Sequence, residues 1–381
     1  MKKILFISHE ATLTGAPMVL LHFMAWIKEH HPEVEVGVLL MKSGQLAERF
    51  HLLANKYYVY QYKKKSYINK LKRKINKLFF AKKPISDEAF FLNQIAYDNY
   101  DVIYANTVLS IETAVKIKSK SQSNTKLIAH IHELAVVLQS ACVSKLAVSK
   151  IDHIIAVSNL VKSNLVNDWE DVNDKTTVVY ECSKIDTELK KHEVNAKNTF
   201  IVGASGFVHW RKGCDVFIQV ARYILKNFAD VNIKFQWVGN VPPLEQMIIT
   251  NDLKKLNLEK HVEFIGEKEN PIPFFQLFDL FLMPSREDPF PLVCIEMGLL
   301  GIPIVCFEKA TGTAEVLLKG GGKIVPYLDV EAMANAIVHY YHHPKVLQAD
   351  GQKASEIFSI FTPEIICPQI YQLIDNEMKI K

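Results

Sequence analysis

The 381-residue sequence lacks the cysteine pattern of a disulfide-rich or zinc-binding protein. Its six cysteines are scattered, and no two of them form a Cys-x-x-Cys pair. Neither a disulfide framework nor a zinc cluster is indicated, and reduced thiols in a cytoplasm fit better. The sequence also has no uninterrupted apolar run of the ~18–20 residues that span a bilayer. The short run Ile4–Ser8 ends too soon for a signal peptide and predicts a first buried strand.

Common nucleotide-binding motifs are also missing. No strand carries a complete Gly-x-Gly-x-x-Gly, which argues against an NAD enzyme, and the P-loop pattern Gly-x-x-x-x-Gly-Lys-Ser/Thr is absent. There is no Asp-x-Asp pair of the kind that holds a divalent ion under a nucleotide-sugar diphosphate. If this chain binds such a diphosphate, arginine and lysine are expected in place of a metal ion.

Basic residues are concentrated in one segment. Ten lie between Gln61 and Ser86 without a single acidic residue, so the rest of the chain has a formal net charge of −6 although the whole chain has +4. A nucleic-acid binder usually spreads its basic surface over the fold, so no nucleic-acid partner is expected. The apolar residues of this segment are spaced three and four apart: Ile68, Leu71, Ile75 and Leu78. A basic amphipathic helix within 63–83 could lie on an anionic membrane, could cover the first domain with its apolar stripe, or could bind an anionic glycan.

Short apolar runs alternate with longer amphipathic ones along the chain. Continuous apolar strands are typical of parallel sheets that helices cover on both faces. In the first half we expect strands at Ile4–Ser8, Val34–Leu40, Val102–Ala105, Leu127–His132, Ile154–Val157 and Thr177–Tyr180, with the clearest helix at Ala16–Lys28. In the second half we expect them at Phe200–Ala204, Ile233–Val238, Val262–Ile265, Leu280–Met283, Ile302–Cys306 and Lys323–Val325.

The polar segment Asp186–Asn198 has no periodicity and predicts a linker. The predicted fold class is therefore α/β, with two tandem Rossmann-like, doubly wound domains facing across a cleft. The predicted domains are residues 1–190 and 198–362, and a C-terminal helix in 363–381 is expected to pack back on the first domain. Ligands are expected at the carboxyl ends of the strands.

The segment Pro284–Gly298 follows an apolar strand and opens a helix. Pro291 suits the first helical turn, and the free N–H groups near Pro291 and Leu292, together with the helix dipole, predict an anion site. Glu296 lies a little over one turn further, among apolar residues. We expect it to point from a mostly buried helix into a cleft, the alternative being a solvated or salt-bridged glutamate.

A second segment, Gly203–Gly213, leaves a strand and enters a helix that starts near Asp215. Arg211 and Lys212 stand at this glycine-flanked helix entry. Such a pair is a natural clamp for a phosphate or diphosphate, although adjacent basic residues in loops are usually only solvated.

Together these two segments resemble the family 4 retaining glycosyltransferases of the GT-B fold. That family has a Glu-x7-Glu motif in a strand-loop-helix, preceded by an Arg/Lys element near Gly-x5-Lys-Gly. Here Asp288 takes the place of the first Glu, Glu296 is the second, and Phe207 takes the place of an Arg beside the glycine. The resemblance runs over nearly the whole chain and includes, in order, Thr14–Ala16, His132–Glu133, Ile155–Ser158, Val238–Gly239, Phe264–Gly266 and Gly312–Glu315.

The resemblance implies a retaining, metal-independent hexosyltransferase without a further cofactor. It would move a sugar from a UDP- or GDP-sugar to a glycan or lipid-linked acceptor in bacterial surface-polysaccharide synthesis. Such an enzyme would be cytoplasmic, with a possible peripheral position on the inner face of the membrane through 63–83. Arg211 and Lys212, with the helix start at Pro291–Leu292, would bind the leaving diphosphate. Glu296 would bind the ribose hydroxyls and Asp288 the donor sugar.

In the first domain the resemblance implies that Gly15 lets the backbone approach the donor phosphate and the acceptor. It makes His132 a candidate contact for the donor sugar or the acceptor hydroxyl, the alternative being a structural histidine at a strand end. His130 is expected on the opposite side of the strand from His132. The segment Asn106–Thr107 is expected to face the cleft without an assigned role, and Glu315 to sit in the first turn of its helix.

Two other functions remain open. One is a non-catalytic membrane-surface module that kept a degenerate nucleotide-sugar site, an idea that the aspartate at 288 supports. The other is a sugar-nucleotide epimerase on a similar scaffold, although that class lacks the Asp288–Glu296 signature. A phosphorylase of the glycogen type would need a pyridoxal-phosphate lysine and a longer chain.

Overall fold

The computed structural model describes residues 2–60, 87–122, 124–185 and 199–379. The predicted basic helix within 63–83 and the predicted linker Asp186–Asn198 lie outside these residues. The chain divides into two compact units. The first unit comprises Met1–Ala156, Val166–Thr177 and Cys367–Lys381, and the second comprises Val157–Leu165 and Val178–Ile366.

The first unit is built on a seven-stranded sheet with the order β3-β2-β1-β4-β5-β6-β7. Its strands are β1 Lys3–Ser8, β2 Glu35–Leu40, β3 Lys56–Val59, β4 Val102–Asn106, β5 Lys126–Ile131, β6 His153–Ala156 and β7 Thr176–Val178. Its helices are α1 Gly15–His30, α2 Ala47–Leu53, α4 Asp87–Tyr97, the 3-10 turn η1 Val108–Ser110, α5 Ile111–Lys118, α6 Ala135–Ala141 and α7 Lys145–Ser149. Helix α8, Asn159–Asp168, contributes to both units.

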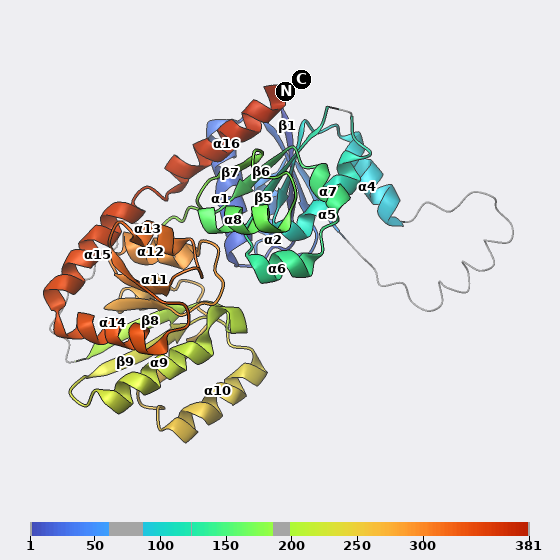
Figure 1. Ribbon diagram of the computed structural model, residues 1–381. Helices are drawn as coiled ribbons and strands as arrows, with labels where there is room; N and C mark the ends of the chain where they lie inside the picture. The colour runs from blue at the N-terminus through green and yellow to red at the C-terminus, as the bar shows by residue number, and fades with distance from the viewer. Residues whose placement is uncertain (1, 61–86, 123, 186–198, 380–381) are drawn as a thin grey trace, which may run out of the picture. The chain divides into compact units, whose positions relative to one another are not determined.

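The second unit is built on a six-stranded sheet with the order β10-β9-β8-β11-β12-β13. Its strands are β8 Phe200–Ser205, β9 Ile233–Val238, β10 Val262–Gly266, β11 Leu280–Met283, β12 Ile304–Phe307 and β13 Gly322–Val325. Its helices are the 3-10 turn η2 Trp210–Lys212, α9 Cys214–Asn227, α10 Pro243–Leu256, α11 Ile272–Phe275, α12 Leu292–Leu299, α13 Thr313–Leu317, α14 Val330–His342, α15 Pro344–Phe358 and the start of α16 Pro363–Lys379. Figure 1 labels β8 and β9 of this sheet, with helices α9 and α14 next to them.

Strands β1 to β6, and separately β8 to β13, pair in parallel with their neighbours. The predicted α/β class with two parallel sheets is confirmed. Strand β3 was not predicted. It is a four-residue strand at the edge of the sheet, half-buried throughout, so its sequence lacks the continuous apolar run that marks the central strands. Strand β12 begins at Ile304 rather than Ile302, since Pro303 has no N–H to give to a sheet.

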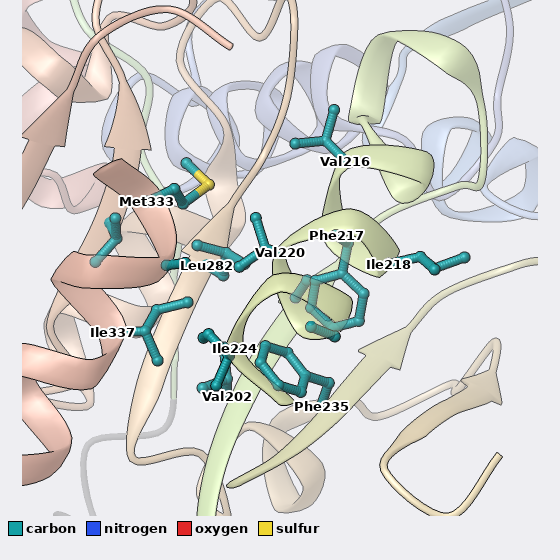
Figure 2. Close-up of a cluster of buried hydrophobic side chains, with 14 of the residues drawn as sticks. Val202, Val216, Phe217, Ile218, Val220, Ile224, Phe235, Leu282, Met333 and Ile337 are labelled. Carbon is teal, nitrogen blue, oxygen red and sulfur yellow. The ribbon is translucent and has the colours of Figure 1, made fainter. Parts of the chain in front are cut away.

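Both faces of the second sheet are covered, which is why its strands read as apolar runs. On one face, side chains of α9 and α14 pack against alternate residues of the strands. Figure 2 shows Phe217 and Ile224 of α9 close to Val202 and Phe235 of the sheet, with Ile337 of α14 beside them. On the other face a Cβ at Gly203 would overlap the Phe278 ring, so the glycine makes room for that side chain. Burial on this scale is the main favourable term in the stability of the unit.

The C-terminal part of α16 packs in the first unit. The Lys2 ammonium pairs with Asp375, and the Tyr371 ring stacks on His31 with 3.8 Å between centroids. Among the described residues, the helical stretch 344–379 is long and apolar enough by composition to cross a membrane. Half of its most apolar window is buried inside the protein, which is also true of a helix that packs in a core.

Candidate active site

The predicted diphosphate-binding residues lie at the point where the strand order of the second sheet reverses. Strands β8 and β11 are neighbours, with β9 and β10 on one side and β12 and β13 on the other. Ligands of doubly wound sheets usually bind outside the carboxyl ends of the strands at such a switch point. Arg211 and Lys212 follow β8 and Asp288 follows β11. The topology thus brings together residues that are far apart in the sequence.

The Asp288 carboxylate is the centre of this cluster. Lys212 Nζ donates to Asp288 Oδ2 at 2.6 Å, and Arg211 Nη1 lies 3.6 Å from Oδ1. Ser285 Oγ donates to Oδ2 at 3.2 Å. Burial alone would raise the pKa of this carboxyl, but the charges of Lys212 and Arg211 outweigh burial and lower the pKa below its ordinary value. Asp288 is therefore ionised at neutral pH, and the three charged groups together carry one excess positive charge.

The two loops that carry these side chains are joined through their backbones. Arg286 N donates to Arg211 O at 2.8 Å, and Arg211 Nη1 donates to Glu287 O at 2.8 Å. The Arg286 guanidinium forms a bidentate pair with Asp215 at 2.9 and 2.8 Å. Asp288 N donates to Ala310 O at 2.8 Å. The cations and the carboxylate are thus held in place by main-chain contacts as well as by their own attraction.

The spacing of glycine and lysine in the first loop has a steric reason. Gly206 has a φ of +142°, and a Cβ there would lie 3.2 Å from Lys212 Cε, so the lysine side chain runs over the glycine. Gly213 has a φ of +70°, and a Cβ there would lie 2.0 Å from Pro284 O. Both positions disfavour any larger residue. Trp237 Nε1 donates to Gly206 O at 2.9 Å, and this hydrogen bond anchors the loop to strand β9.

Helix α12 begins beside this cluster. Pro291 is its N-cap, one position before the first turn in which it was expected, and the helix starts at Leu292. Leu292 and Val293 are half-buried, and the first N–H groups of a helix have no partner inside it. The N–H groups of Leu292 and Val293 are therefore placed to donate to an anion, whereas Pro291 has no N–H of its own, and anion binding at this helix start stays a prediction.

Glu296 is partly buried, and its Oε1 accepts a hydrogen bond from Ser183 Oγ at 2.9 Å. Burial raises the pKa of this carboxyl, and the Ser183 hydroxyl only partly offsets that effect. The recorded partner of Glu296 is thus a hydroxyl, while Arg211 and Lys212 are engaged with Asp288. Sequence reasoning missed Ser183. The feature of the sequence that could have indicated Ser183 as a site residue is its place in the segment before the linker, where related sequences often have Asn-Gly-Val-Asp.

Glu315 lies in the first turn of α13, as expected, and it caps another helix. Its carboxylate accepts from the N–H groups of Asn159 at 3.1 Å and Leu160 at 2.7 Å, and from Tyr180 Oη at 3.0 Å. The two N–H groups form the start of α8, where a negative charge satisfies free N–H donors and interacts favourably with the helix dipole. The contacts indicate a structural role for Glu315.

In the first unit, His132 follows β5, and its Nε2 lies 3.0 Å from Asn106 Oδ1. The prediction that His130 faces the opposite side of the strand is wrong, because the centroids of the His130 and His132 rings are 4.1 Å apart. Residues i and i+2 of a strand share a face, and only adjacent residues alternate. Gly15 begins α1, and a Cβ there would have no neighbour within 4 Å.

Within the described ranges 2–60, 87–122, 124–185 and 199–379, no group of three or more His, Cys, Asp or Glu side chains is arranged to hold a metal ion. A cavity of about 690 Å³ in the first unit lies beside α6 and α7 and is lined by residues that include Leu138, Trp169 and Lys175. None of the predicted site residues lines it.

Residues 198–343, which carry Arg211, Lys212, Asp288 and Glu296, match the family model described as glycosyl transferases group 1. Residues 198–343 are thus a group 1 glycosyltransferase domain. This confirms the family that the sequence motifs indicated, for a region that lies within the second unit.

Curated relatives of this chain include proteins of polysaccharide synthesis. It is 31% identical over 137 residues to an exopolysaccharide phosphotransferase of Streptomyces coelicolor, a match that covers 35% of this chain and 14% of the relative. It is 24% identical over 232 residues to the capsular polysaccharide biosynthesis glycosyltransferase CapM of Staphylococcus aureus, with 60% of each chain covered. The chain thus spans 60% or less of the length of these two relatives.

Solved structures match this chain over nearly its full length. HepE of Anabaena in complex with UDP and glucose has a TM-score of 0.76 and 21% identity, with 98% of this chain and 100% of HepE covered. A glycosyltransferase from Rickettsia africae has a TM-score of 0.79 and 14% identity, with 100% of this chain and 99% of that one covered. These similarities confirm the GT-B fold.

Proposed function

We propose that this protein is a retaining, metal-independent glycosyltransferase. It moves a hexose from a nucleotide-diphosphate sugar to a glycan or lipid-linked acceptor in the synthesis of a bacterial surface polysaccharide. The observation that carries the proposal is the buried Asp288 carboxylate held by Lys212 and Arg211 at the switch point of the second sheet.

The charges of this cluster suit the leaving group. As the glycosidic bond breaks, negative charge grows on the departing diphosphate, and cations that are already in place lower the barrier. Arg211 and Lys212 outnumber the single carboxylate, and the Arg211 side chain is 30% exposed, so it is accessible to a ligand. The first N–H groups of α12 add donors for the same anion. These groups supply the neutralisation that a metal ion supplies elsewhere.

The two carboxylates suit the hydroxyl groups of the donor. Asp288 is ionised and can only accept hydrogen bonds, so it can hold a sugar hydroxyl in the way that it now holds Ser285 Oγ. Glu296 already accepts from the Ser183 hydroxyl, and a ribose diol presents the same chemistry to it. Aspartate is one methylene shorter than the glutamate of related sequences, so the donor sugar is expected to sit closer to the β11 loop.

The relatives guide the choice of substrates. HepE was solved in complex with UDP and glucose, and the name of CapM assigns it to capsular polysaccharide synthesis. We therefore propose a UDP-hexose as the first donor to test, with a GDP-sugar as the second, and a growing glycan or its lipid carrier as the acceptor. We also propose a cytoplasmic protein that binds the inner face of the membrane through residues 63–83.

A panel of nucleotides and nucleotide sugars tests the function. A ligand that binds only the folded state raises the melting temperature, so UDP, GDP, ADP and their sugars are first compared by thermal shift. Each stabilising sugar is then incubated with the protein. Slow release of the free nucleotide supports a transferase. Interconversion of the sugar identifies an epimerase, and binding without turnover identifies a non-catalytic module. Either of the last two results would overturn the proposal.

A further inference from the structure

The first unit has its own polar cluster at a switch point. In its sheet the strand order reverses between β1 and β4, which are neighbours, and β5 follows β4. His9 directly follows β1, Thr107 directly follows β4 and His132 directly follows β5. Three polar side chains from distant parts of the sequence thus lie at adjacent strand ends, where doubly wound sheets bind their ligands.

Thr107 has a strained backbone. Its φ is 91°, a value that is a genuine outlier for a β-branched residue. Neighbouring contacts hold it there. Thr107 N donates to His130 O at 2.8 Å, Ser110 Oγ donates to Thr107 O at 2.8 Å, and Val108 N donates to the Glu133 carboxylate at 3.1 Å. Strain of this kind is typical of functional sites, because the structure around it must maintain it.

The strained threonine holds His9. Thr107 Oγ1 lies 3.1 Å from His9 Nδ1, whereas a glycine at position 107 would adopt the same φ without strain but would have no hydroxyl. The His9 side chain is 20% exposed, and its Nε2 lies 3.7 Å from Glu10 Oε1, which is beyond hydrogen-bond distance. One ring nitrogen of His9 is therefore positioned by the Thr107 hydroxyl, and the other lies beyond hydrogen-bond distance of the Glu10 carboxylate in a side chain that is partly exposed.

Burial lowers the pKa of His9, an effect that Glu10 opposes and that His132 and Lys42 reinforce. The imidazole is consequently neutral at pH 7 and can either donate or accept a hydrogen bond. His132 belongs to the same cluster through Asn106, whose Nδ2 donates to Ala16 O at 3.0 Å. That bond ties the cluster to the first turn of α1, next to Gly15.

We propose that His9 is an acceptor-binding residue, whose Nε2 hydrogen-bonds the incoming hydroxyl group while Thr107 holds the ring through Nδ1. This inference rests on the proposed function. In the transfer, the hydroxyl oxygen bonds to the anomeric carbon, the bond from that carbon to the diphosphate oxygen breaks, and the hydroxyl proton passes to the diphosphate. His9 orients the hydroxyl and ends the reaction neutral. Water takes the place of the acceptor hydroxyl when no glycan is present.

Two substitutions of His9 separate the proposed contact of Nε2 with the acceptor hydroxyl from the contact of Nδ1 with Thr107. Asparagine places a polar atom near the position of Nδ1, so His9→Asn keeps the contact to Thr107 and loses Nε2. Glutamine places a polar atom near Nε2 and loses the contact to Thr107. Release of the free nucleotide from the donor that the panel identifies is measured without acceptor, and affinity for UDP or GDP is measured by calorimetry.

We expect His9→Asn to slow nucleotide release at least tenfold, His9→Gln to retain more activity than His9→Asn, and both to bind the free nucleotide within twofold of wild type. His51→Gln, which changes an exposed histidine of the same unit, is the control. Unchanged release in His9→Asn, or more activity in His9→Asn than in His9→Gln, would overturn the inference alone. Failure of the wild type to bind any nucleotide would overturn the proposed function and this inference with it.

Position 107 provides an independent measurement. Thr107→Gly removes both the strain and the hydroxyl, so it is expected to raise the melting temperature while it slows nucleotide release at least fivefold. Thr107→Ser keeps the hydroxyl and is expected to retain most of the activity. A Thr107→Gly variant that releases nucleotide at the wild-type rate would show that the strained hydroxyl has no part in the reaction.

Discussion

Asp288 sets the charge of the candidate site. Its carboxylate neutralises one of two adjacent cations, and its pKa is low because those cations outweigh the effect of burial. A buried carboxylate that loses its charge leaves both partners uncompensated, which is the costly way to break a buried ion pair.

Asp288→Asn should therefore destabilise the protein by about 3 kcal/mol, measured by urea denaturation. The variant should also bind UDP at least as tightly as the wild type, because two cations then face the diphosphate without a competing carboxylate. Turnover of the donor should fall at least tenfold, since Asp288 is proposed to hold the donor sugar. Glu269→Gln, an exposed neutralisation in the same unit, is the control. Weaker UDP binding in Asp288→Asn would contradict this account of the cluster.

The pKa of Glu296 is shifted in the opposite direction from the pKa of Asp288. Because burial raises its pKa, the folded state favours the protonated form, and the ionised form is destabilising at pH 7. Glu296→Gln should thus be more stable than the wild type at pH 7 by about 1 kcal/mol, and this advantage should shrink as the pH falls through the raised pKa. Denaturation curves at several pH values measure the difference. An advantage that grows on acidification would contradict the prediction. UDP affinity should fall about tenfold, because a neutral amide accepts hydrogen bonds from a diol more weakly.

The cost of Asp288→Asn should also shrink on acidification, for a different reason. A carboxyl with a lowered pKa contributes stability above its ordinary pKa and loses that stability as the pH falls through its folded value. As the pH falls, the wild type thus loses its stability advantage over Asp288→Asn, while Glu296→Gln loses its stability advantage over the wild type.

Helix α8 depends on a carboxylate from outside its own segment. Its first N–H groups are satisfied by Glu315, which lies on α13. Short helices gain stability from such contacts, because their end groups otherwise have no partner.

Glu315→Ala should destabilise the protein by about 2 kcal/mol and should increase amide hydrogen exchange at 159–165. Nucleotide affinity should stay within twofold of wild type, since the contacts of Glu315 are structural. Glu259→Ala removes an exposed carboxylate elsewhere in the second unit and should change neither quantity. Exchange at 159–165 that matches the wild type would refute the capping role.

The molecule as a whole has an uneven charge. Ten of its basic residues lie between Gln61 and Ser86, outside the described residues, and the remaining chain is acidic. A basic segment contributes about 1 kcal/mol per residue to binding at an anionic membrane surface. We propose this segment as the membrane contact of the protein.

Neutralising Lys70, Lys72, Arg73 and Lys74 to glutamine should reduce sedimentation with anionic vesicles by more than tenfold, because electrostatic attraction supplies most of the binding energy. Added salt should have a similar effect on the wild type. UDP binding by the variant should be unchanged, and neutral vesicles serve as the control. Sedimentation equal to that of the wild type would retire the membrane proposal.

The sequence by itself determined most of the strands, their order and the family, and it missed the edge strand β3. Strands β9 and β11 have the predicted bounds, because a doubly covered parallel strand must be apolar throughout and that pattern is visible in one dimension. The glycines of the Arg211–Lys212 loop were equally visible, since backbone geometry and close packing restrict those positions to glycine.

Only the tertiary structure decided which side chains meet. Lys212 pairs with Asp288, Ser183 with Glu296 and His9 with Thr107, and no spacing in the sequence encodes these contacts. The Lys212–Asp288 and His9–Thr107 contacts depend on strands that are distant in the chain and adjacent in a sheet, and the Ser183–Glu296 contact joins the segment after β7 to α12. The strain at Thr107 is likewise invisible in the sequence, because it arises from the contacts that hold the backbone on either side of that residue.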